Sequence, residues 1–320
     1  MMNPLMTGAV CAALAIASSA NAQFLYVAES GQDRVVALNA FDSSVVNANF
    51  LDIAAAAASV GYTGTTTPIE AMDVGNEIWV TDQNADRVWR FNQDGTFAGQ
   101  YGVAPTNGQG LLNNGRGFEV VGNTAYFAQG SDASGIGGQG ESITTMDITT
   151  GTLTGSFIEG VTADTSYNDV LAVNGELYVS DGDSGFDAIE RWSTAGGFLG
   201  FFAQSVDDTT DFDQPQQIAQ RANGDILLAG FSLPAGVYGF AADGTPQGIV
   251  SGMDQGPRGV VELADGSIMY TGGIDVEIDG TVVQTGSGLS WRFLTATTVP
   301  APGALAAFGV LGVFARRRRA

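Results

Sequence analysis

Seven polar residues stand at matching places in five short apolar segments of this 320-residue chain. Aligning the segments puts them at two adjacent positions: Glu70, Arg116, Asn168, Asp169, Gln216, Gln217 and Arg258. Arg116 and Arg258 fall at the same position, and an arginine fork can hold a carboxylate or another anion through two parallel hydrogen bonds. The sequence therefore predicts a polar ligand site where these segments converge. The alternative is a polar channel that holds only water.

The same set contains a candidate metal site. Glu70, Asn168 and Asp169 offer hard oxygen ligands of the kind that Ca²⁺ prefers. A second candidate is the run from Asp181 through Asp183 to Asp187, where acids alternate around glycines. Such a run can wrap Ca²⁺, but Trp192 stands where a calcium loop of the EF-hand type has its glutamate. The alternative for this run is a solvated loop between strands. Ca²⁺ is thus the one cofactor that the sequence suggests.

The residues that are missing exclude much chemistry. The chain has no His, and its one Cys is Cys11. This excludes a Ser-His-Asp triad, a Cys-His pair, zinc held by His and a disulfide within the chain. The sequence shows no convincing catalytic constellation, so we assign no catalytic residue.

The charge is strongly acidic. There are 34 acids and 12 basic residues, all of the latter Arg, and four of these form the run Arg316, Arg317, Arg318 and Arg319 near the C-terminus. The central body therefore has eight Arg against 34 acids, a net charge of −26. Such a body repels nucleic acid, because binding phosphates requires cations. The simplest reading of this charge is solubility.

Six short apolar segments recur along the body. Their central residues are 53, 47, 52, 49 and 42 positions apart, namely Tyr26, Trp79, Tyr126, Tyr178, Leu227 and Met269. This spacing is close to that of the four-stranded blade of a β-propeller. Dipeptides such as Gly75-Asn76 and Asn174-Gly175 precede the segments and favour hairpin turns. The sequence therefore predicts an all-β, six-bladed propeller of four-stranded antiparallel blades. A strand within residues 290–298 would complete the first blade, and residues 54–58 would form one short helix.

One of these segments carries a family resemblance. The stretch from Val80 through Asp82, Asp86 and Arg87 to Phe91 resembles an NHL repeat, and the stretch from Val27 to Leu38 does so more loosely. The resemblance implies a six-bladed propeller. Gluconolactonase-like propellers, which share this architecture, hold a metal at the ring where Glu70, Asn168 and Asp169 stand. Their full set of Glu, Asn, Asn and Asp is not reproduced here. Streptogramin-lyase-like propellers depend on His, which this chain lacks.

The N-terminal residues, 1–22, predict a secretory signal peptide. An apolar stretch is followed by Ala20-Asn21-Ala22, in which Ala20 and Ala22 give the small-x-small form of a cleavage site. No Lys or Arg precedes Arg34, so the usual positively charged start is absent. The alternative is a buried N-terminal helix.

The C-terminal residues, 299–320, contain Pro300, Pro302 and Gly303, then an apolar stretch, then the four arginines. As a helix the apolar stretch would be roughly 20 Å long, short of a ~30 Å hydrocarbon core. The order of these parts resembles the PEP-CTERM sorting signal, in which a membrane enzyme of the exosortase type recognises the tail. Ala301 replaces the acidic residue of that motif. An ordinary tail anchor is the alternative.

These observations divide the chain into a signal peptide (1–22), a propeller (23–298) and a sorting tail (299–320). We expect an exported protein of a Gram-negative-type envelope, surface or matrix, which contacts the membrane transiently through its tail. Its expected partners are the export machinery and the sorting enzyme, then envelope proteins, glycans or matrix. The favoured function is a non-catalytic binding or scaffold module. The alternatives are a Ca²⁺-dependent hydrolase of the lactonase type and a purely structural envelope protein.

Overall fold

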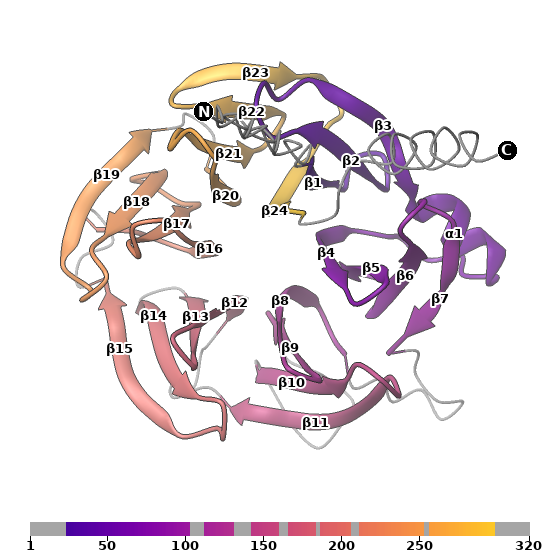
Figure 1. Cartoon of the computed structure of the whole chain (residues 1–320), viewed down its shortest axis with the longest axis horizontal. Coiled ribbons are helices and arrows are strands. Elements are labelled where there is room, and N and C mark those ends of the chain that lie inside the picture. Colours follow the sequence, from indigo (N-terminus) through magenta and orange to yellow (C-terminus); the bar gives the residue numbers. More distant parts are fainter. Residues whose placement is uncertain are drawn as a thin grey trace, which may run out of the picture. The chain divides into compact units, whose positions relative to one another are not determined.

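Six four-stranded sheets stand around a central axis in the computed structural model of the chain (Figure 1). The structure describes residues 24–102, 112–130, 142–159, 166–183, 186–205, 211–252 and 256–297. The expected signal peptide and sorting tail lie outside the described residues. Among the described residues no helix has the length and apolarity needed to cross a membrane.

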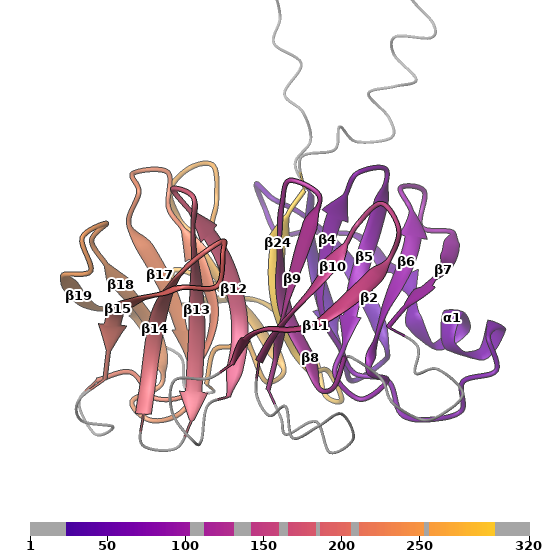
Figure 2. The ribbon, with the colours of Figure 1, turned by 90° about the horizontal axis from the view of Figure 1, so that it is seen from below.

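Each sheet is one blade, and its strands run antiparallel from the axis outward (Figures 1 and 2). The inner strands are β24 (Trp291–Ala296), β4 (Pro68–Val74), β8 (Gly115–Val121), β12 (Tyr167–Val173), β16 (Pro215–Gln220) and β20 (Gly259–Glu262), for blades 1 to 6 in order. The second strands are β1 (Phe24–Glu29), β5 (Glu77–Asp82), β9 (Thr124–Gln129), β13 (Glu176–Asp183), β17 (Ile226–Gly230) and β21 (Ile268–Gly272). The third strands are β2 (Arg34–Asn39), β6 (Arg87–Asn92), β10 (Ser142–Asp147), β14 (Phe186–Ser193), β18 (Gly236–Phe240) and β22 (Asp275–Ile278). The outer strands are β3 (Val45–Asp52), β7 (Phe97–Tyr101), β11 (Thr152–Glu159), β15 (Phe198–Gln204), β19 (Pro246–Gly252) and β23 (Thr281–Thr285).

The predicted six-bladed, all-β architecture is confirmed. The first two strands of blades 2, 3 and 4 meet at two-residue turns, and Gly75, Gly122 and Gly175 adopt the positive φ that such turns require. In blades 5 and 6 the corresponding loops are five residues long. Gly224 and Gly266 supply the positive φ there.

Blade 1 is closed by the two ends of the propeller. Its inner strand β24 comes from the C-terminal side and pairs with β1 in the register Val27 opposite Leu294. The Thr297 amide donates to the Phe24 carbonyl at 2.9 Å at one end of this pair. The predicted closing strand within residues 290–298 is therefore confirmed.

The core lies between the blades, because each sheet buries both faces against its neighbours. Between blades 1 and 2, Leu51 packs with Val80, Trp89 and Phe91 in one such cluster. The helix α1 (Ile53–Ser59), which confirms the predicted short helix, adds Ile53, Ala56 and Ala57 to this cluster. Asp52 caps its N-terminus, because the Asp52 side chain accepts the Ala55 amide at 2.8 Å. The second and third strands are thus buried, whereas outer strands such as β19 are mostly exposed.

Candidate functional site: an arginine cluster at the propeller axis

The inner strands place two rings of side chains around the axis. The first ring lies at the start of these strands and contains Ile69, Arg116, Asn168, Gln216, Arg258 and Arg292. The second ring, one residue further along each strand, contains Glu70, Gly117, Asp169, Gln217, Gly259 and Phe293. All seven residues predicted from the sequence therefore belong to these two rings. The alignment omitted Arg292, because the inner strand of blade 1 comes last in the chain and no hairpin joins it to the second strand.

The polar residues of the second ring join blades together. Glu70 of blade 2 accepts the Phe118 amide of blade 3 at 2.7 Å and the Thr295 hydroxyl of β24 at 3.1 Å. Asp169 of blade 4 accepts the Ile218 amide of blade 5 at 2.8 Å.

Gln217 of blade 5 has the same role. Its Oε1 atom accepts the amides of Val260 at 2.9 Å and Leu294 at 3.0 Å. Its Nε2 atom donates to the Leu294 carbonyl at 2.8 Å. Glu70, Asp169 and Gln217 therefore join the inner strands of different blades.

Burial changes the acidity of the two carboxyl groups in the second ring. It raises the pKa of Glu70 to about 8, although the hydrogen bonds from Phe118 and Thr295 oppose this. Burial, and then the charge of Glu70, raise the pKa of Asp169 well above its usual value. The two groups are near one another, and the protonated form is favoured at both.

Side chains from separated blades meet in the second ring. A Cβ atom at Gly117 of blade 3 would lie 2.0 Å from Asp169 Oδ1 and 2.9 Å from Phe293 Cε2 of blade 1. Phe293 is fully buried. The ring beneath the arginines is therefore closely packed around these three residues.

Three arginines of the first ring gather above this layer. We call Arg116, Arg258 and Arg292 the arginine cluster. Burial, and then the positive charge of Arg292, lower the pKa of Arg116 to about 10. Burial, and then the charges of Arg292 and Arg116, lower the pKa of Arg258 to about 9. Burial also lowers the pKa of Arg292, against the opposing effect of Glu29. The cluster is thus a set of half-buried cations that repel one another.

Neutral groups hold each arginine of the cluster in place. Arg116 donates through Nη1 to the Asn168 side-chain oxygen, while its buried Nε atom has no hydrogen-bond partner among the residues that the structure describes. The guanidinium of Arg258 lies 4.1 Å from the centre of the Phe231 ring. Arg292 donates to the Ser30 hydroxyl at 2.8 Å.

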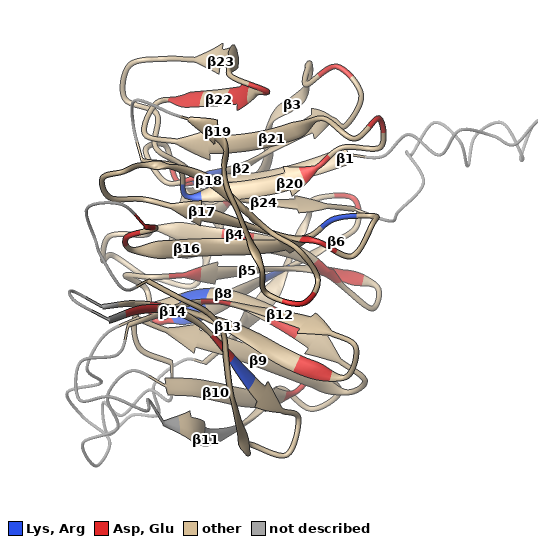
Figure 3. Ribbon diagram, turned by 90° about the vertical axis from the view of Figure 1, so that its left-hand side faces the viewer, with Lys and Arg blue, Asp and Glu red and all other residues tan. Residues whose placement is uncertain are grey.

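The ion pairs of the described chain lie elsewhere. They join Arg34 to Glu29, Arg90 to Glu77, Arg191 to Glu176 and Arg221 to Glu262. No ion pair within the described ranges involves the cluster. Figure 3 shows how far acidic segments outnumber basic ones. A group of arginines that forms no ion pair with the described part of so acidic a protein can bind an anion.

Asn168 and Gln216, two further members of the first ring, bond mainly to other parts of the protein. Asn168 is buried, and its Nδ2 atom donates to the carbonyls of Ser166 at 3.1 Å and Pro215 at 2.9 Å. Gln216 is also buried, and its backbone carbonyl accepts the Ser180 hydroxyl at 2.6 Å. Asn168 therefore positions Arg116, and both polar atoms of its side chain are engaged in hydrogen bonds.

The run from Asp181 to Asp187 forms a β-hairpin in which Gly182 pairs with Asp187. Asp181 accepts the Ser166 amide at 2.7 Å, and Asp187 accepts the Gln214 amide at 3.0 Å. Both carboxylates thus contact the segments that lead into inner strands. The side chain of Asp183 lies outside the described residues. Among the described residues, no group of three or more His, Cys, Asp or Glu side chains is arranged to hold a metal.

Asp181 belongs to a recurring structural position that the sequence analysis missed. This position is occupied by Glu29, Asp82 and Gln129 at the ends of β1, β5 and β9, and by Asp181 two residues before the end of β13. Asp82 of the NHL-like stretch accepts the amides of Thr67, Asn84 and Ala85 and the Trp89 indole N–H at 2.8–3.1 Å. Glu29 accepts the Ser290 amide at 2.8 Å, and Gln129 the Asn113 amide at 2.9 Å. In the sequence, this position could have been found from the polar residue that ends each of these four aligned segments.

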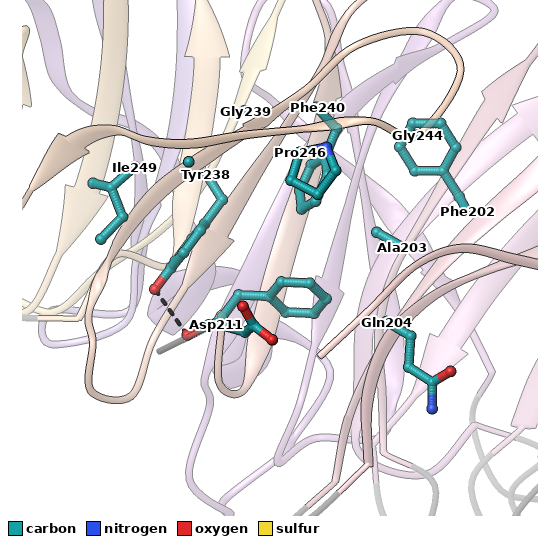
Figure 4. Close-up of a pocket in the computed structure, with 12 residues that line it drawn as sticks. Phe202, Ala203, Gln204, Asp211, Tyr238, Gly239, Phe240, Gly244, Pro246 and Ile249 are labelled. Atoms are coloured by element: carbon teal, nitrogen blue, oxygen red, sulfur yellow. Dashed lines mark hydrogen bonds between the residues drawn. The ribbon is translucent and has the colours of Figure 1, made fainter. Parts of the chain in front are cut away.

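A hollow of about 500 Å³ lies between blades 4 and 5, away from the axis (Figure 4). Phe202, Tyr238, Phe240 and Ile249 line it, and the Tyr238 hydroxyl donates to the Asp211 carbonyl at 3.1 Å. Burial, and then Asp211 and Asp213, raise the pKa of Tyr238 to about 12. Tyr238 and Phe240 are themselves buried. Most of the residues that line the hollow are apolar, so it offers few polar groups to orient a ligand.

Comparisons with known proteins support the fold. No protein-family model matches the chain, and no curated protein sequence does. Its structure is similar to a chain in the crystal structure of a nidogen/laminin complex, with a TM-score of 0.63 and 15% identity over 86% of this chain and 98% of that one. A protein of unknown function from Bacteroides caccae gives a TM-score of 0.57 and 12% identity, over 87% and 99%. Virginiamycin B lyase from Staphylococcus aureus gives 0.47 and 13%, over 74% and 71%. Identities this low establish the propeller fold and no more.

Proposed function

We propose that this chain is an exported, envelope- or surface-displayed propeller that acts as a non-catalytic binding module, and that it binds an anionic ligand at the arginine cluster. The observation that carries the proposal is the gathering of Arg116, Arg258 and Arg292, none of which forms an ion pair with a described residue. Burying cations without counter-charges costs free energy, which a bound anion would recover. Export and sorting rest on the two terminal segments of the sequence.

The arrangement of the acids supports a binding role over the lactonase alternative. Glu70 and Asp169 are bonded to backbone amides of neighbouring blades, so one oxygen of each carboxyl group is engaged in joining blades. Asn168, the third residue of the predicted metal set, is bonded to Arg116.

Thermal unfolding of the full-length chain tests the proposal. At constant ionic strength, we expect sulfate and acetate to raise the midpoint saturably relative to chloride, because they bind only the folded state. The double variant Arg116→Ala/Arg258→Ala should lose this response. The control Arg191→Ala, which removes an arginine paired with Glu176 on the surface, should keep it.

Two results would count against the proposal. One is that no anion stabilises the wild-type chain. The other is saturable stabilisation by Ca²⁺ after chelator treatment, together with turnover of a lactone that Glu70→Gln abolishes. The second result would establish the lactonase alternative.

A further inference from the structure

The number and origin of the arginines restrict the shape of the anion. Arg116 belongs to β8 of blade 3, Arg258 directly precedes β20 of blade 6 and Arg292 belongs to β24 of blade 1. Figure 1 shows these three inner strands at different positions around the axis. A carboxylate has two oxygens, and a single arginine fork can engage both. A group with three terminal oxygens can accept hydrogen bonds from all three arginines at once.

The charge of the site restricts the charge of the anion. Asn168, Phe231 and Ser30, which hold the arginines, are neutral. Glu29 acts on Arg292 through its charge, but it is paired with Arg34. Glu70 and Asp169, one layer below, accept backbone amides of neighbouring blades, and burial raises the pKa of each carboxyl group. Coulombic attraction to three cations grows with the charge of the ligand, so a dianion is favoured over a monoanion.

Gly130 shows that space is reserved for one of these guanidinium groups. A Cβ atom at Gly130 would lie 2.3 Å from Arg116 Nε and 2.7 Å from its Cζ. Gly130 does not have a positive φ, so its backbone conformation is open to other residues. Glycine is therefore required at this position to leave room for the Arg116 guanidinium, and not because of the backbone conformation.

We propose that the arginine cluster binds the terminal three-oxygen group of a phosphate monoester, which carries close to two negative charges near neutral pH. This inference rests on the proposed function and names the class of ligand for the same site. A sulfate ester has the same three terminal oxygens but one charge, and it therefore separates the effect of shape from that of charge.

Titration calorimetry on the full-length chain with methyl phosphate, methyl sulfate and acetate tests the inference at fixed ionic strength. At pH 7.5 we expect methyl phosphate to bind at least about tenfold more tightly than acetate, with methyl sulfate between them. At pH 5 methyl phosphate is largely a monoanion, because its second pKa is about 6. Its affinity should then fall to that of methyl sulfate, which should not change.

Variants separate the cluster from the rest of the surface. Arg292→Lys keeps the positive charge but loses the two parallel donors of the guanidinium. It should lower the affinity for methyl phosphate at least about fivefold. Gly130→Ala should do the same by displacing Arg116, and circular dichroism and the unfolding midpoint would show that the fold is kept. Arg191→Ala is the matched control and should bind as the wild type does.

Two outcomes would overturn the inference and are distinguishable from one another. If acetate binds as tightly as methyl phosphate, and Arg116→Ala/Arg258→Ala loses both, the phosphate assignment fails while anion binding at the cluster stands. If none of the three anions binds, the proposed function fails as well.

Discussion

Arg258 illustrates at the scale of a single residue how a functional group can work against stability. Its guanidinium is half-buried, stacked on Phe231 and close to two other cations. The cation–π contact contributes about 1 kcal/mol or somewhat more in such a setting. Burial and repulsion by Arg116 and Arg292 oppose it, as the lowered pKa of about 9 indicates.

We therefore expect Arg258→Met to stabilise the ligand-free protein. Methionine keeps apolar contact with Phe231 while removing one of three repelling charges, and replacing poorly paired buried charges by apolar groups often gains 1 kcal/mol or more. Chemical denaturation in a chloride buffer without oxyanions would show a gain of about 1 kcal/mol in the free energy of unfolding. The same substitution at Arg191, whose partner Glu176 is on the surface, should change it by less than about 1 kcal/mol. A loss of more than about 1 kcal/mol in Arg258→Met would show that the cluster stabilises the empty protein.

At the scale of strands, the inner strands are tied to one another by side chains rather than by a shared sheet. Each blade is a separate sheet, and among the described residues no ladder of backbone hydrogen bonds joins neighbouring blades, although the Gln217 amide donates to the Arg258 carbonyl at 3.2 Å. Glu70, Asp169 and Gln217 supply bonds between them instead. Protonation of the two acids is thus coupled to the contact between blades.

This coupling predicts that stability falls as the pH rises from about 5 to 8. The pKa of Glu70 is raised from 4.5 to about 8 in the folded state, and that of Asp169 is also raised, so between these values the folded state holds more protons than the unfolded state. Raising the pH then favours unfolding, and the stabilising contribution is lost as the pH passes through the folded-state pKa. Denaturant unfolding at several pH values should show a decline of ~2 kcal/mol or more over this window.

Glu70→Gln identifies the source of this decline. Glutamine can still accept the Phe118 amide but does not ionise, so the free energy of unfolding should decline less steeply above pH 5. Glu77→Gln is the control, because the pKa of Glu77 is lowered by its hydrogen bond to Arg90 and its effect belongs to lower pH. A Glu70→Gln profile parallel to that of the wild type would contradict the assignment.

The strands also show what the sequence could and could not predict. The turn dipeptides and the recurring apolar segments locate the blades, because both patterns follow from local backbone geometry. The same alignment brings Arg116 and Arg258 to one ring. It cannot decide whether Glu70 and Asp169 face a ligand or a neighbouring amide, since that depends on packing between blades. Arg292 was missed because β24 joins its sheet only through a contact between the two ends of the propeller.

At the scale of the whole molecule, closure of the ring depends on that single strand. β24 forms the inner edge of blade 1, supplies Arg292 to the cluster and gives Gln217 its partner at Leu294. It also carries Phe293, which packs against Gly117 across the axis. The folded ring and the proposed site therefore share this strand.

A circular rearrangement of the chain tests this dependence without removing any residue that closes the ring. β24 ends at Ala296, which lies opposite Leu25 in the antiparallel pair, and Thr297 is bonded to Phe24. Residues 289–297 joined to residue 24 through an Asn-Gly turn, with the chain ending at residue 288, would give blade 1 the sequential strand order of the other five. We expect this chain to unfold in one cooperative step and to bind oxyanions as the original does. The matched chain of residues 24–288, without β24, should lose the cooperative transition because an inner edge and its interblade bonds are absent. Cooperative unfolding of the shorter chain at an unchanged midpoint would show that blade 1 does not need β24, and would contradict the role assigned to it.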